Sequence, residues 1–359
     1  MIITIISFIL ILGLLVFVHE LGHFIAAKKN GILVEEFGIG FPPRLFGIKK
    51  GETLYTINLL PLGGFVKVYG EEYHELATKD KIHKDRAFAY KKPWQKAIVI
   101  VAGVIGNFLL GWVLISFLFT QGVPVAINKV FVDSVQHSSP AEQAGLKKDD
   151  IISSLTPQSG SAIPLGTSSE LATIIQKYGD KQVTLTYIRN GNTYETQLTP
   201  RKNPPPGQGS IGIVMITKFT ERKYPWYQAP FYGLGHAFDI TKTIVTELSK
   251  TIIQLVSLQK PQVDVTGPIG IARFTGQAIK FGHNAVLEFI ALLSLNLAVV
   301  NILPFPALDG GRLVFIIYEW ITKKRVNQAF ERNLNLAGIV ILLTLAVLIS
   351  INDVIKIYK

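Results

Sequence analysis

The sequence contains no cysteine and few charged residues. With cysteine at 0 in a chain of 359 residues, disulfide bonds, thiolate zinc sites and thiol nucleophiles are excluded. Charged residues make up 17% of the chain, against about 25% in a typical soluble domain, while hydrophobic residues reach 48%. This composition excludes a disordered chain and indicates membrane-spanning segments. Any bound metal must therefore be held by His, Asp or Glu.

Four long apolar runs predict at least four transmembrane helices. They cover residues 1–18, 97–120, 285–303 and 334–351. Eighteen helical residues span about 27 Å, close to the roughly 30 Å hydrocarbon core of a bilayer. The alternative for the first run is a cleaved signal peptide. That run lacks a preceding basic stretch and a small-residue cleavage site, so we favour a retained helix.

Acidic residues are scarcer than basic ones, 25 against 36, which gives a net charge of +11. Basic residues gather in the 28–96 stretch and in the short 323–332 segment. The positive-inside rule predicts that both segments are cytoplasmic, so that residues 122–284 face the outside. The basic excess thus fits membrane-flanking loops, and we expect no nucleic-acid partner.

Residues 125–203 resemble a compact α/β module. The pattern predicts helices over 139–146 and 170–178, strands over 182–189 and 193–198 joined by an Asn190-Gly191 turn, and a last strand over 209–213. This order, including the Ser-Pro-Ala-x-x-Ala-Gly-Leu segment, resembles the PDZ domains of bacterial proteases. A PDZ domain binds an extended chain at a sheet edge. The alternative is a generic α/β spacer.

The motif His19-Glu20-Leu21-Gly22-His23 follows the first apolar run. Residues i and i+4 of a helix lie on one face, so both imidazoles can bind one zinc ion. Glu20 is placed to take a proton from the attacking water. Polar groups at the end of an apolar span are costly in lipid and indicate function. The alternative is a pair of interfacial histidines with a snorkelling glutamate.

A catalytic zinc ion typically has three protein ligands, so one is still missing. We expect the remaining histidines to be ordinary surface residues: His74, His83, His137, His236 and His283. A better candidate is Asp309, which follows the third apolar run on the same predicted side of the membrane. Pro304 and Pro306 break the helix there, and non-helical backbone at membrane depth needs protein or a watery cavity around it. The alternative is a helix-capping aspartate in a cytoplasmic loop.

These motifs together resemble the site-2 protease family of intramembrane metalloproteases, in the bacterial branch that includes the regulator-of-sigma-E protease. The matching segments are HELGH at 19–23, LPLGGFVK at 60–67, the PDZ-like insert, TGPIGIA at 266–272 and NILPFPALDGG at 301–311. The chain departs from the pattern at Val104, where relatives often have proline. Only one PDZ unit is visible, whereas some relatives carry two.

The resemblance implies roles for particular residues. His19, His23 and Asp309 would bind Zn²⁺, and Glu20 would be the catalytic acid and base. Asn301 would contact the substrate backbone. The substrate strand would also meet the segment Gly63, Gly64 and Phe65.

We therefore expect a polytopic α-helical membrane protein with about four transmembrane helices, an inserted α/β PDZ domain and a membrane-associated β-hairpin. The hairpin would pair 54–58 with 65–69. Residues 229–258 have the spacing of an amphipathic surface helix rather than a fifth span, and 266–276 would be a loop. The expected divisions are 1–121 for two transmembrane helices and the hairpin, 122–216 for the extracytoplasmic PDZ domain, 217–284 for an amphipathic membrane-surface region, and 285–359 for the last two helices.

The implied function is an intramembrane zinc endopeptidase of the bacterial cytoplasmic (inner) membrane. It would cleave single-span membrane proteins after a first extracytoplasmic cut, with anti-sigma factors or signal-peptide remnants as substrates. Its partners would be those substrates, the lipid bilayer, and a peptide or substrate ectodomain at the PDZ domain. Two alternatives remain at this point: a transporter with polar residues along an ion path, and a catalytically inactive PDZ scaffold. No internal repeat of the transporter type is visible.

Overall fold

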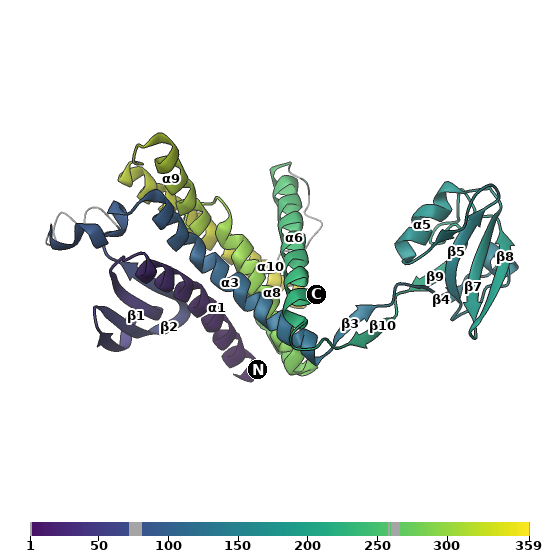
Figure 1. Cartoon of the computed structure of the whole chain (residues 1–359), viewed down its shortest axis with the longest axis horizontal. Coiled ribbons are helices and arrows are strands. Elements are labelled where there is room, and N and C mark those ends of the chain that lie inside the picture. Colours follow the sequence, from purple (N-terminus) through teal and green to yellow (C-terminus); the bar gives the residue numbers. More distant parts are fainter. Residues whose placement is uncertain (1, 72–80, 258, 260–265, 359) are drawn as a thin grey trace. The chain divides into compact units, whose positions relative to one another are not determined.

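The computed structural model describes residues 2–71, 81–257, 259 and 266–358. Its chain divides into two compact units (Figure 1). One unit combines Met1–Gln121 with Tyr224–Lys359, and the other is Gly122–Lys223. The second unit is therefore an insertion in the first.

Within the described residues, four helices are long and apolar enough to cross a membrane, as the sequence predicted. They are α1 (Ile2–Lys29), α3 (Pro93–Gln121), α8 (His283–Ile302) and α10 (Gln328–Tyr358). Their outer faces carry large apolar side chains, such as Ile2 on α1 and Leu343 on α10, which are 73% and 62% exposed. Such surfaces are unfavourable in water and suit lipid.

Helix α3 lies between α1 and α8, and α6 (Ala229–Val256) and α9 (Asp309–Thr322) also contact it. Glycines make its crossing with α1 close. A Cβ on Gly22 would collide with the backbone of Ala102, and one on Gly106 would lie 2.8 Å from the carbonyl oxygen of Val18. Small residues allow such close approach of helices in membranes. The crossing places the last turns of α1 directly against α3.

Two long strands, β1 (Val34–Lys50) and β2 (Thr53–Val68), form a sheet that contacts α1. The predicted pairing of 54–58 with 65–69 was wrong. Both runs instead pair with Glu36–Ile39, which contacts Leu54–Ile57 on one side and Gly64–Lys67 on the other. The prediction failed because the sequence pattern did not reveal β1. This strand lies between the two runs and pairs with one of them along each of its edges.

The segment after the inserted unit is mainly helical. Helix α6 confirms the helix expected after residue 229, and Ala237, Ile240 and Ile244 pack against α3 and α8. The expected loop at 266–276 was wrong, because α7 runs over Pro268–Phe281. Two short 3₁₀ helices, Lys81–Arg86 and Phe88–Tyr90, precede α3.

The inserted unit has the predicted mixture of strands and helices. Its main sheet has the strand order β8-β7-β5-β4-β9, and β6 pairs with β5. A separate two-stranded ladder joins the ends of the unit, β3 (Val123–Ala126) with β10 (Phe219–Arg222). The other elements are β4 (Val130–Val135), α4 (Pro140–Gln143), β5 (Ile151–Pro157), β6 (Ile163–Pro164), α5 (Ser168–Lys177), β7 (Val183–Arg189), β8 (Asn192–Leu198) and β9 (Ile213–Ile216).

Local sequence signals explain several of these elements. Thr167 and Glu170 form a capping box at the start of α5. Asn190 and Gly191 take φ values of 50° and 82°, as a tight hairpin between β7 and β8 requires. The last strand begins at Ile213, later than the predicted 209–213, because Gly212 turns the chain at φ 72°.

Candidate metal centre

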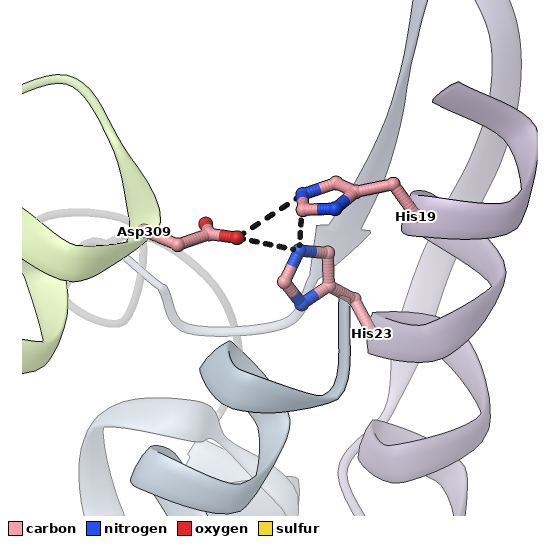
Figure 2. A group of neighbouring side chains, drawn as sticks. All are labelled: His19, His23 and Asp309. Atoms are coloured by element: carbon pink, nitrogen blue, oxygen red, sulfur yellow. Dashed lines mark hydrogen bonds and ion pairs between the residues drawn. The ribbon is translucent and has the colours of Figure 1, made fainter. Parts of the chain in front are cut away.

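Two helices bring the predicted ligands together. His19 and His23 lie one turn apart on α1, with their Nε2 atoms 3.2 Å from each other. Asp309 is the first residue of α9, and its Oδ2 lies 3.1 Å from Nε2 of His19 and 3.2 Å from Nε2 of His23. Figure 2 shows the three side chains pointing at one another. The structure thus places all three residues that the sequence singled out at one point.

The chain before α9 is shaped to deliver Asp309 to the two imidazoles. Helix α8 ends at Ile302, and Pro304 and Pro306 follow. Close packing then requires glycine after the aspartate. A Cβ on Gly310 would collide with the carbonyl oxygens of Leu303 and Ile302, and one on Gly311 with that of Phe305. An ion pair between the buried Lys96 Nζ and the half-buried Glu319 Oε2, at 2.9 Å, holds α9 against α3.

The three donor atoms fit a zinc ion. Tetrahedral ligands about 2.0–2.1 Å from zinc lie about 3.3 Å from one another, close to the separations here. Apart from its ion-pair distances to the two Nε2 atoms, the buried Oδ2 atom of Asp309 has no hydrogen-bond partner among the described residues, and a bound cation would satisfy it. Within the described part of the chain, no other group of three such side chains converges.

A cavity of about 360 Å³ opens beside the three ligands. Glu20, Gly64, Phe65 and Arg312 line it. A Cβ on Gly64 would lie 3.2 Å from Cγ of Glu20, so the strand runs directly past this carboxylate. Gly63 does not line the cavity; it packs against the ring of Phe41. The cavity therefore brings two of the three expected glycine-segment residues to the metal centre.

Of the remaining predicted positions, Asn301 lies at the metal centre, and the other described histidines do not. Asn301, near the end of α8, has its Nδ2 atom 3.5 Å from both ring nitrogens of His19. His137 pairs with Glu142 on the inserted unit, and the ring of His236 packs against Phe119. Neither of these two histidines belongs to the described metal group, and His283 does not belong to it either. His74 lies outside the described residues, and the side chain of His83 lies outside the described part as well.

Sequence reasoning missed part of the site on α3. The backbone oxygen of Val99 lies 2.8 Å from Nδ1 of His23, and the amide nitrogen of Asn107 lies 3.4 Å from Nδ1 of His19. Gly103 leaves the space that both imidazoles occupy. The available signal was a glycine and an asparagine four residues apart in an apolar span, where polar side chains indicate function.

Comparisons with known proteins agree on one family. A model described as Peptidase family M50 matches residues 7–345. The chain is similar to Regulator of sigma-W protease RasP of Bacillus subtilis (strain 168), with 30% identity over 430 residues and 99% of each chain covered. It is 35% identical over 345 residues to Putative zinc metalloprotease CPE1693 of Clostridium perfringens (strain 13 / Type A), covering 95% of each.

Two further similarities concern a second RasP and a separate domain. The chain is 29% identical over 433 residues to Zinc metalloprotease RasP of Shouchella clausii (strain KSM-K16), covering 99% of this chain and 100% of that one. Among solved structures, the PDZ domain of the SdrC-like protein (Lmo2051) from Listeria monocytogenes aligns with 26% of this chain and 94% of that chain. Its identity is 23% and its TM-score is 0.22.

Proposed function

The chain belongs to peptidase family M50 and is a zinc metalloprotease of a membrane, and we propose that it cleaves the transmembrane segments of single-span membrane proteins. The observation that carries this proposal is the position of the metal centre. Its two histidines stand on α1, one of the four apolar helices, and its aspartate begins α9, which follows another of them, α8. A protease built this way acts on a peptide bond at membrane depth.

We assign the metal to His19, His23 and Asp309. Zinc bound there would polarise the scissile carbonyl and make the attacking water more acidic. Glu20, which lines the cavity beside these ligands, takes the proton from that water and delivers it to the leaving amine. Because Glu20 adjoins His19 in the chain, the rigid helix α1 positions base and ligands together.

The substrate must be extended at the cut, because a helix hides its carbonyl groups in internal hydrogen bonds. Gly64, Phe65 and Val66 pair with Ile39, Gly38 and Phe37 on one side. Among the residues that the structure describes, no strand pairs with their other edge, and the same residues line the cavity. An extended substrate segment would add to this edge, which replaces its lost hydrogen bonds. Asn301, beside His19, would hold the strand near the metal.

The sheet also has the surface expected of a membrane-associated element. Phe46 pairs with Ile57, and Leu59 follows two residues later on the same strand; these side chains are 57%, 52% and 52% exposed. Solvent exposure of several neighbouring large apolar side chains indicates an interaction surface. We infer that this surface rests in the bilayer, so that the open edge meets a substrate helix as it leaves the membrane.

The distribution of charged residues supports one orientation of the protein in the bacterial cytoplasmic membrane. Basic residues flank the α1 end that carries the metal ligands, as in Lys28 and Lys29, which suits a cytoplasmic site. The inserted unit would then be extracytoplasmic. The name of the Bacillus subtilis relative, Regulator of sigma-W protease, supports an anti-sigma factor as the substrate class. We propose in addition that this substrate is first cut outside the membrane. Signal-peptide remnants have the same single-span chemistry.

We propose that the inserted unit is a PDZ domain that meets the substrate's outer part. Among the described strands, β9 pairs with β4 alone, so its other edge is available for an extended peptide. The domain divisions 1–121, 122–216, 217–284 and 285–359 remain our proposal for how these tasks are distributed along the chain.

Co-expression with tagged single-span proteins tests the proposed activity. Wild type is expected to release a shortened product, and Glu20→Gln is expected to lose cleavage by about 10²–10⁴-fold or more, because the amide cannot accept a proton. Zinc content is measured on the same samples and is expected to be unchanged. Near-normal cleavage by a zinc-loaded Glu20→Gln would show that another residue is the base.

A further inference from the structure

We propose that Asn107 is a positioning residue that fixes the ring of His19 for metal binding. The inference rests on the metal site of the proposed function. Asn107 stands on α3, which packs against α1, and its side chain is fully buried at 0% exposure. Its amide nitrogen lies 3.4 Å from Nδ1 of His19, on the ring edge away from the ligand atom. Burying a polar side chain in a membrane span costs free energy, so a residue of this kind indicates a function.

The arrangement of the ligands determines where the proton of each imidazole must be. Both Nε2 atoms face Asp309, so Nε2 must keep its lone pair for the metal and Nδ1 must carry the hydrogen. His23 satisfies this requirement by donating its Nδ1–H to the backbone oxygen of Val99 at 2.8 Å. His19 needs an equivalent acceptor, and Asn107 is the side chain beside its Nδ1.

The amide of Asn107 can supply that acceptor after half a turn about its last bond, which exchanges oxygen and nitrogen without moving the rest of the side chain. Its Oδ1 atom is buried and lacks a hydrogen-bond partner among the described residues. The exchange brings this unpartnered oxygen onto the donor that the metal-binding form of His19 offers. Hydrogen bonds of this kind orient metal-binding imidazoles and raise their basicity.

The backbone that carries Asn107 is itself fixed. The buried hydroxyl of Ser294 on α8 donates to the backbone oxygen of Asn107 at 2.7 Å. Helix α3 is thereby tied to α8 at the same residue that contacts His19 on α1. A positioning residue requires a backbone that is fixed in this way.

Asn301 does not serve the same purpose, although it also lies near His19. Its Nδ2 atom is 3.5 Å from Nδ1 and 3.5 Å from Nε2. An atom equally distant from both ring nitrogens does not lie along the N–H direction of either one. Asn301 is therefore left for the substrate, and the two asparagines have separate tasks.

Zinc affinity of the purified full-length protein, measured by competition with a chelator, tests the proposal without any substrate. Asn107→Ala and Asn107→Leu are expected to weaken zinc binding by about 10–100-fold, the usual effect of removing such a partner. Asn107→Asp keeps an acceptor at the same position and is expected to bind zinc more tightly than either of these variants, with an affinity close to that of wild type. Asn352→Ala, which changes an exposed asparagine on α10, is the control and is expected to keep wild-type affinity.

Wild-type affinity in Asn107→Ala would overturn the proposal. So would Asn107→Asp binding as weakly as Asn107→Leu, because loss of packing rather than loss of the acceptor would then explain both. A wild-type protein that bound no zinc would instead overturn the metal site of the proposed function, and this inference with it.

Discussion

At the scale of single residues, the metal centre depends on space as well as on ligands. Gly103 of α3 faces the last turns of α1, and a Cβ there would collide with Nε2 of His23 and lie 2.9 Å from Cε1 of His19. The spacing His-x-x-x-His predicted both ligands because it operates within one helix. The need for glycine arises from packing between two helices, so the sequence marks it less directly, through the spacing of Gly103 and Asn107 within an apolar span.

Gly103→Ala is expected to displace the imidazoles and weaken zinc binding by at least about tenfold, the scale of a disturbed ligand orientation. Chelator competition measures the change. Gly13→Ala on α1 is the matched control, because a Cβ there meets nothing within 4 Å. Equal zinc affinity in both variants would show that the imidazoles tolerate an added methyl group.

At the scale of helices and turns, some elements are determined by a few neighbouring residues and others by contacts with distant parts of the chain. The capping box of α5 and the Asn190-Gly191 turn were predictable because each is complete within a few residues. Helix α7 was not, because its glycine-rich start is stabilised from a distant helix. The carboxylate of Asp353 on α10 accepts from the backbone N–H groups of Gly267 at 3.0 Å and Gly270 at 2.9 Å. Free N–H groups at a helix start need such acceptors.

Asp353→Ala is expected to lower the free energy of unfolding by about 1–3 kcal/mol, because it leaves buried N–H groups without an acceptor. Thermal unfolding in detergent measures this as a lower midpoint temperature. Asn352→Ala, at the exposed neighbouring position, serves as control and is expected to change little. An unchanged midpoint in Asp353→Ala would mean that water replaces the carboxylate at no cost.

At the scale of the whole molecule, the inserted unit begins and ends with the two strands of one ladder, β3 and β10. Hydropathy and charge predicted the insertion between two membrane spans, since such long polar sections stand out from apolar runs. The β1–β2 sheet was only partly predictable, because its pairing joins segments whose alternation is weak. The resemblance placed Gly63, Gly64 and Phe65 of this sheet at the site, and of these Gly64 and Phe65 line the cavity.

Replacing residues 127–218 by Asn-Gly is expected to relax substrate selection, since the β3–β10 ladder can close as a tight hairpin. If the inserted unit excludes bulky outer domains, the variant will cleave substrates with long ectodomains as readily as shortened ones. Gel analysis of paired long and shortened substrates measures the ratio. Loss of cleavage of the shortened substrate, with zinc retained, would show that the unit is needed structurally instead.

The central claim is that His19, His23 and Asp309 together hold one zinc ion, and zinc content per purified chain tests it most directly. Wild type is expected to contain about one zinc ion per chain, since the three donor atoms complete one site. His23→Ala and Asp309→Ala are expected to lose it, while His137→Ala, which changes an exposed histidine, keeps it. Full zinc content in both His23→Ala and Asp309→Ala would contradict the account.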